Sequence, residues 1–159
     1  MRTVLARVLA VVLALGLGFA LFATAGHLFS RVAHASSGPG STMSFGTATL
    51  VNRVILDLPV TITCSIPGDA TLQGWQQSSA TVSQTVGRTV ITNSGWLSTI
   101  ICTGAPVTYI AQITPNADTP AYHPGPAIAS AFYYIPYCEP TSCGAASDGL
   151  NNVPITIAD

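Results

Sequence analysis

The stretch that decides the fold is VTITCSI at positions 60–66, in which apolar and polar side chains alternate. A period of two places successive side chains on opposite faces of a strand, so this segment predicts a strand with one buried and one hydroxyl-bearing face. The run VTYIAQIT at 107–114 shows a similar alternation, and VPITI at 153–157 repeats it near the C-terminus. We therefore expect the chain to fold as a series of strands.

Five further segments are rich in the β-branched and aromatic residues that favour strands. They are residues 47–57, 79–86, 89–92, 98–103 and 127–137. Turns are predicted around the Gly-, Pro- and Asn-containing positions 58–59, 67–69, 86–88, 93–95, 115–118, 123–126 and 147–152. Seven or eight short strands, with no convincing helical period after residue 35, predict an all-β antiparallel sandwich, and a small closed barrel is the alternative.

Charge is scarce in this chain of 159 residues. Only 7% of the residues are charged, 48% are apolar, and lysine is absent. Residues 36–159 hold two arginines against six carboxylates, a formal net charge of −4. Nucleic acid and polybasic membrane surfaces are excluded as partners, because both kinds of binding need several cations.

The N-terminal segment is predicted to direct export. Residues 8–25 carry no charge and follow Arg2 and Arg7, which is the pattern of a secretory signal. Small residues that would suit cleavage end at Ala25 and at Ala35, and cleavage after Ala35 is preferred. The alternative is an uncleaved anchor, which would hold the protein at the outer face of the cytoplasmic membrane.

The expected domain organisation follows from this segment. We expect a signal peptide at 1–35, a flexible linker rich in Ser, Gly and Pro at 36–45, and the β-domain at 46–159. The protein is expected to be secreted, or to be anchored through residues 8–25.

The four cysteines all lie in the part predicted to be exported. An even number of cysteines behind a signal segment predicts two disulfides. Of the three pairings that four cysteines allow, we favour Cys64–Cys102 and Cys138–Cys143. A zinc site would need more ligands at metal spacing than these cysteines and His123 offer, so no metal or cofactor is expected.

Candidate catalytic groups are few. His123 is the only histidine after residue 35, and it follows Asp118 by five positions. A hydrolase would pair this imidazole with a serine and a carboxylate, but no nucleophile-elbow motif is present. A loop histidine with no catalytic role is the favoured interpretation, and the protein is not expected to be an enzyme.

The aromatic run FYYIPY at 132–137 is the most informative candidate for binding. Alternate residues of a strand point to opposite faces, so one set fills the core and the other is exposed or lines a cleft. The candidate ligand-binding residues, drawn from this run and from nearby predicted loops, are Trp75, Trp96, Tyr133, Tyr134 and Tyr137. The alternative is that both faces are covered inside the domain.

Two family resemblances follow from short motifs. The tail, with YCEPTSC at 137–143, SDG at 147–149 and VPITI at 153–157, resembles the C-terminal hairpin of the neocarzinostatin-type apoproteins. That resemblance implies a secreted immunoglobulin-like sandwich and a cleft for an apolar chromophore.

The middle of the chain resembles uncharacterised secreted sandwich domains of actinobacteria and related Gram-positive-type bacteria. The motifs are VTITC at 60–64, VSQ at 82–84, CTGAP at 102–106 and GPA at 125–127. This resemblance implies an immunoglobulin-like fold and export, and it carries no catalytic residue.

The functional expectation is an exported, non-enzymatic module with a binding or surface-structural role. Its partner would be a protein or a small apolar ligand, and poorly protected edge strands make self-association a further hypothesis. The first alternative is a carrier of a small apolar ligand in an aromatic cleft. The second is a hydrolase that uses His123 and Asp118.

Overall fold

The computed structural model describes residues 40–159, and in that part every regular element is a strand. The signal segment at 1–35 and its alternative as an anchor lie outside the described residues. Among the residues described, no helix is long and apolar enough to cross a membrane. The prediction of an all-β protein is confirmed.

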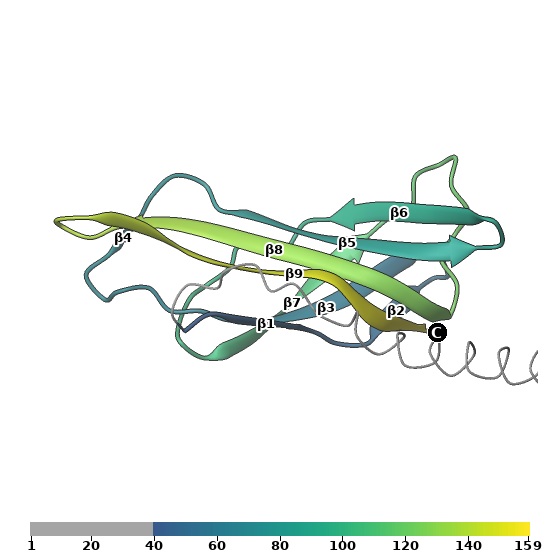
Figure 1. Cartoon of the computed structure of the whole chain (residues 1–159), viewed down its shortest axis with the longest axis horizontal. Helices are drawn as coiled ribbons and strands as arrows, with labels where there is room; N and C mark the ends of the chain where they lie inside the picture. The colour runs from purple at the N-terminus through teal and green to yellow at the C-terminus, as the bar shows by residue number, and fades with distance from the viewer. Residues whose placement is uncertain (1–39) are drawn as a thin grey trace, which may run out of the picture. The chain divides into compact units, whose positions relative to one another are not determined.

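Nine strands make up the fold of residues 40–159 (Figure 1). They are β1 (Thr42–Phe45), β2 (Ala48–Val51), β3 (Ile55–Thr63), β4 (Thr71–Leu72), β5 (Gln77–Val86), β6 (Thr89–Gly95), β7 (Pro106–Ile113), β8 (Gly125–Cys138) and β9 (Cys143–Ala158). The count exceeds the predicted seven or eight because β1 and the two-residue β4 were not predicted, whereas the predicted strand at 98–103 does not form. β1 and β2 together make up a first strand that is divided in two.

The strands form one mixed sheet that has two halves. In the β3 half, β3 pairs with β7 on one side and with β1 and β2 on the other. In the β8 half, the order is β9–β8–β5–β6, with β4 beside the end of β8. The halves are joined because β2 also pairs with β9, and this pairing is parallel. The prediction of a purely antiparallel arrangement was therefore wrong at this one junction.

Pro59 explains why the first strand is divided. Position 58–59 was predicted as a turn, yet Pro59 lies inside β3 and pairs with Ile110 of β7. A proline has no N–H to give to a ladder, and the ladder with β1 and β2 is interrupted opposite it. Gly46 sits in that gap and donates its N–H to the Pro59 carbonyl at 2.9 Å.

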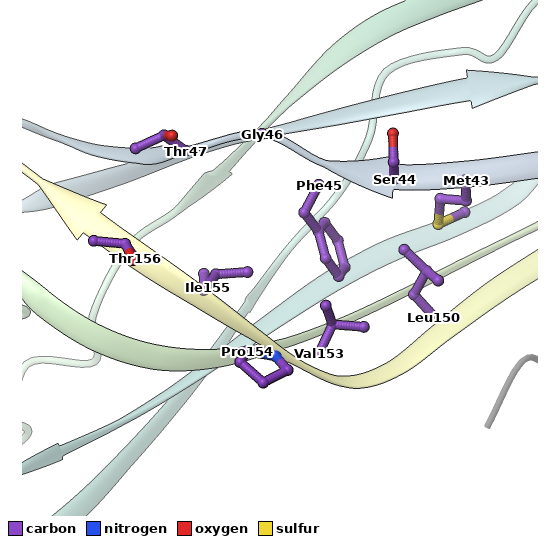
Figure 2. A pocket seen from close by; sticks show the side chains of 10 residues that line it. All are labelled: Met43, Ser44, Phe45, Gly46, Thr47, Leu150, Val153, Pro154, Ile155 and Thr156. Carbon is purple, nitrogen blue, oxygen red and sulfur yellow. The ribbon is translucent and has the colours of Figure 1, made fainter. Parts of the chain in front are cut away.

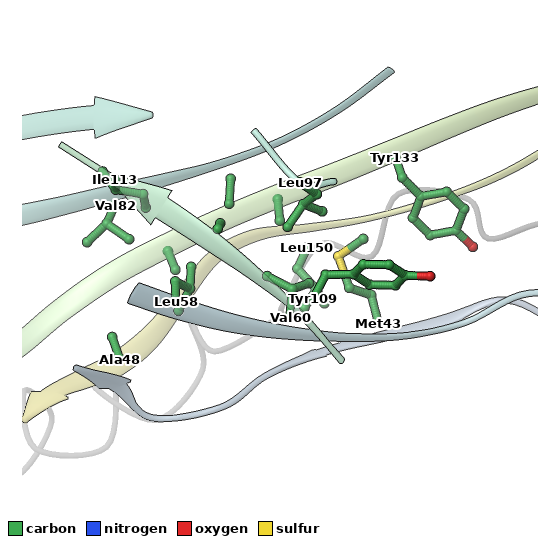
Figure 3. Packing of buried hydrophobic residues seen from close by; sticks show 14 of the residues in the cluster. Met43, Ala48, Leu58, Val60, Val82, Leu97, Tyr109, Ile113, Tyr133 and Leu150 are labelled. Atoms are coloured by element: carbon green, nitrogen blue, oxygen red, sulfur yellow. The ribbon is translucent and has the colours of Figure 1, made fainter. Parts of the chain in front are cut away.

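The core lies between the two halves (Figure 3). Alternate residues of β3 are buried, among them Leu58 and Val60, and they face Val82 of β5 and the alanines of β8. Small residues on β8 leave room for large buried ones such as Ile113 on β7. This burial pattern follows the period of two predicted from residues 60–66.

Three further local predictions of turns and strands were wrong. Residues 93–95 were predicted as a turn but end β6, and residues 147–152 lie within β9, where Asn152 has a φ of 54° that marks an irregularity. Residues 98–103, predicted as a strand, have no regular structure because hydrogen bonds to other segments hold them. The sheet also begins at Thr42, inside the predicted linker.

Both predicted disulfides are confirmed, and no described cysteine is free. Cys64–Cys102 ties the segment after β3 to the long connection between β6 and β7. Cys138–Cys143 closes the hairpin between β8 and β9. Such bonds are typical of an oxidising compartment.

Candidate binding surface

The structure separates the five candidate aromatic residues into two groups. Tyr133 is only 1% exposed and belongs to the core, and Tyr137 is half-buried with its ring over Gly144 of the paired strand. Trp75 is 71% exposed, Trp96 is 77% exposed and Tyr134 is 43% exposed. The side chains of the 132–137 run therefore alternate between a buried and an exposed face, and Tyr134 lies on the exposed face.

Three of the exposed rings lie on the same face of the β8 half. Phe132 of β8 pairs directly with Ser79 of β5 and is 44% exposed. On the other side of Ser79 lies Trp96, because Ala80 pairs with Gly95 and the Ser78 hydroxyl donates to the carbonyl of Leu97 at 3.2 Å.

Tyr134 lies two residues beyond Phe132 on the same face. We call Trp96, Phe132 and Tyr134 the aromatic strip. The sheet thus gathers three rings from two separate parts of the sequence into one exposed surface.

The side-chain amide of Gln76 holds two loops together, the one before β5 and the connection between β6 and β7. The Gln76 amide nitrogen donates to the carbonyl of Ile100 at 2.9 Å, and the Ile100 N–H donates to the Gln76 amide oxygen at 2.8 Å. Trp75 precedes Gln76, and Gln73 is held by a hydrogen bond to the Pro136 carbonyl. Trp75 is therefore presented on a short arch that is fixed at both ends.

A small polar hollow separates these two loops. Its volume is about 350 Å³ and its lining contains the side chains of Ser78, Ser98 and Thr99. Trp75 lies between the lining residues Gly74 and Gln76 in the chain, and Trp96 directly precedes the lining residue Leu97. Hydroxyl groups and exposed indole rings are therefore neighbours at this end of the molecule.

A second, more apolar pocket lies between β1 and β9 (Figure 2). Its volume is about 550 Å³, and Figure 2 shows Phe45 pointing from β1 towards Val153 of β9, with Met43 near Leu150. None of the predicted binding residues lines it. The apolar side chains that line it belong to the core or pack against it, and the core is partly open to solvent on this side.

His123 has no catalytic partner among residues 40–159. Its ring nitrogen Nδ1 lies 3.0 Å from the carbonyl oxygen of Pro124, and its ring makes no hydrogen bond with a hydroxyl or a carboxylate of the described residues. Asp118 is exposed in the connection between β7 and β8. No group of three or more metal-ligating side chains occurs in that part of the chain.

Two buried tyrosines carry the resolved pKa shifts. Burial raises the pKa of Tyr122, and the hydrogen bond from Asn93 opposes this rise. Burial also raises the pKa of Tyr133, and the charge of Asp148 raises it further. The Tyr122 hydroxyl donates to the Val82 carbonyl at 2.9 Å, whereas no hydrogen bond satisfies the Tyr133 hydroxyl within the described residues.

The two tyrosines should therefore respond oppositely to replacement. Tyr133→Phe removes an unsatisfied buried hydroxyl, and we expect the free energy of unfolding at pH 7 to rise by about 1 kcal/mol. Tyr122→Phe leaves two buried partners unpaired, and we expect a loss of about 2 kcal/mol. Urea denaturation of each variant measures these changes, and equal losses in both would contradict the assignment.

The same variants test the pH dependence. Each raised pKa means that the folded protein holds the phenol proton more tightly than the unfolded chain does. That stabilisation is complete below a pH of about 10, the ordinary tyrosine pKa, and it is lost as the pH rises above this value. Tyr133→Phe should make the alkaline loss of stability shallower.

Comparisons with known proteins found no match: no family model, no curated protein and no solved structure is significantly similar to this chain.

Sequence reasoning missed Gln76, Gln84 and Tyr122, which hold loops to the sheet. Gln84 accepts a hydrogen bond from the His123 N–H and donates to the His123 carbonyl at 2.8 Å. The partners lie 24 to 40 positions apart in the chain. No local pattern marks such contacts, although a glutamine at an otherwise apolar strand position, as at Gln84, is a weak signal.

Proposed function

We propose that the chain is an exported, immunoglobulin-like β-module that binds an uncharged partner through the aromatic strip and catalyses no reaction. The strand order supports the immunoglobulin-like assignment. One layer would hold β1, β3 and β7, the other β9, β8, β5 and β6, with the divided first strand contributing to both. Layers of this composition are those of an immunoglobulin sandwich.

The aromatic strip is the single observation that carries the binding proposal. Large exposed rings cost solvation free energy unless a partner covers them, and such rings are enriched where proteins bind partners. The connection that follows Trp96 is held by the Cys64–Cys102 disulfide and by the Gln76 amide, which bonds to Ile100. A preformed surface loses little conformational entropy on binding.

Export is supported by the two disulfides and by the uncharged segment at residues 8–25. A module released from the cell, or anchored outside it, would meet the components of the outer envelope first. We therefore expect the partner among them.

The apolar pocket between β1 and β9 is an observation in favour of the carrier hypothesis. It holds Phe45 as its only aromatic side chain, and the neocarzinostatin-like aromatic cleft would need several. The aromatic strip is the stronger candidate because its rings are far more exposed.

Envelope binding tests the proposal. The full exported protein is mixed with washed envelopes of the cell that produces it, and bound protein is measured by sedimentation. The double variant Trp96→Ala/Phe132→Ala should bind about a hundredfold more weakly, because each lost ring contact contributes about 1.4 kcal/mol, or a factor of ten.

Ile110→Ala is the matched control, since Ile110 is a half-exposed apolar residue on β7 of the other half. It should bind as the wild type does. Thermal unfolding confirms that both variants are folded. Equal binding by wild type and double variant would refute a role for the strip.

A further inference from the structure

We propose that the partner of the aromatic strip is an uncharged polysaccharide chain. This inference rests on the proposed function and names the chemical class of the ligand. Three properties of the surface around the strip support it: the absence of charge, the density of hydroxyl groups and the spacing of the rings.

The outer face of β5, β6 and β8 carries no charged side chain. Register and burial place these residues on it: Gln77, Ser79, Thr81, Ser83, Thr85, Val90, Thr92, Ser94, Ile128, Ser130, Phe132 and Tyr134. Arg88 is the cation nearest to these strands in the sequence. It lies in the turn between β5 and β6, at the opposite end of β5 from the aromatic strip. A charged partner would lose hydration here without gaining an opposite charge, so charge complementarity selects a neutral partner.

Hydroxyl groups make up most of the remaining face. The hydroxyls of Thr81 and Ser94 are 2.9 Å apart, and those of Ser83 and Thr92 are 2.8 Å apart. A hydroxyl has one donor and two acceptor positions, so each pair keeps unused capacity on the solvent side. Sugar hydroxyls have the same mixed donor and acceptor character, and they can exchange hydrogen bonds with such a surface.

The rings have a spacing that suits an extended chain. Phe132 and Trp96 lie on either side of Ser79, so they are two strand spacings apart, about 10 Å. Tyr134 lies about 7 Å from Phe132 along β8. The C–H groups on one face of a sugar ring are attracted to the negative face of an aromatic ring. Aromatic rings separated in this way can contact successive sugar units of one chain.

The hollow beside Trp96 extends this surface. Ser98 and Thr99 contribute hydroxyls there, and Trp75 stands on the adjacent arch. A polysaccharide that crosses the strip would reach polar groups at its end. The face has no charged groups that could form ion pairs with a protein partner or with a second copy of this chain, whereas its hydroxyl groups suit a neutral glycan.

The experiment measures binding of the full exported protein to defined glycans. The probes are insoluble cellulose and chitin, tested by sedimentation, and soluble xylan, galactomannan and β-1,3-glucan, tested by affinity electrophoresis. The wild type should bind at least one of them, with less than a twofold change between low and high salt because no ion pairs form. Trp96→Ala and Phe132→Ala should each weaken that binding at least tenfold, and Ile110→Ala should leave it unchanged.

The outcomes separate the inference from the proposed function. Binding to none of the glycans, together with strip-dependent binding to envelopes, would overturn the inference and leave the function standing. If the protein binds neither the glycans nor the envelopes, both the inference and the proposed function are overturned. A dimer in light scattering that Trp96→Ala dissociates would show that a second copy covers the strip. Glycan binding that high salt abolishes would also overturn the inference.

Discussion

Replacement of Cys64 and Cys102 by alanine is expected to lower the free energy of unfolding by about 4 kcal/mol. The bond closes a loop with a sequence separation of 38, and cross-linking a loop of that size restricts the unfolded chain strongly. Domains of this size have total stabilities of only about 5–15 kcal/mol, so the loss is a large fraction. Urea denaturation of the double variant measures it.

The second disulfide provides the control. Cys138 and Cys143 are five positions apart and already face each other in the β8–β9 ladder, so their replacement by alanine should cost about 2 kcal/mol or less. Hydrogen exchange adds a local test. Loss of Cys64–Cys102 should increase exchange at Ile101 and Gly104, whose N–H groups bond to Tyr109 and to the Cys64 carbonyl. Equal losses in the two double variants would contradict this account.

Gly95→Ala is expected to destabilise the protein by about 3 kcal/mol. Gly95 ends β6 where this strand meets β7, and a Cβ there would overlap the carbonyl oxygen of Gln112 and lie 2.9 Å from its carbonyl carbon. Both obstacles are backbone atoms, so the two edge strands would have to separate. Overpacking of this kind typically costs about 1–3 kcal/mol, and the rigid obstacle places Gly95 at the upper end.

Gly68→Ala is the matched control for this prediction. Gly68 lies in the turn after β3, and a Cβ there would meet no atom within 4 Å. Alanine at such a site restricts the unfolded chain, so stability should stay the same or rise by about 0.4–1 kcal/mol. Thermal and urea denaturation of both variants give the comparison. A Gly95→Ala variant as stable as the wild type would show that β6 and β7 are not in backbone contact.

The sequence predicted the strands better than their junctions. Alternation at residues 60–66 and 107–114 identified the centres of β3 and β7, because each strand buries one face. The turn assigned at residues 93–95 was wrong because Asn93 finds buried partners in Tyr122 and the Asn116 N–H, which compensates a poor strand former. The place of Pro59 inside β3 depends in the same way on Gly46 in the gap opposite it.

The candidate surface could be predicted only in part. Trp75, Trp96 and Tyr134 were named from the sequence, and the structure leaves all three exposed. Phe132 was not among the candidates although it shares a face with Tyr134, because the candidates from this run were tyrosines, whose polar tip suits recognition. Tyr133 was named because alternation does not tell which face is buried, and it lies in the core.

By itself, the sequence determined the all-β character and the two disulfides. These features depend on side-chain chemistry, cysteine number and a local period of two. Only the tertiary structure decided which rings share a face, that β2 joins β9 in parallel, and that Gln76 ties two distant loops together. Those features depend on contacts between segments tens of residues apart, which form when the two halves of the sheet close over one core.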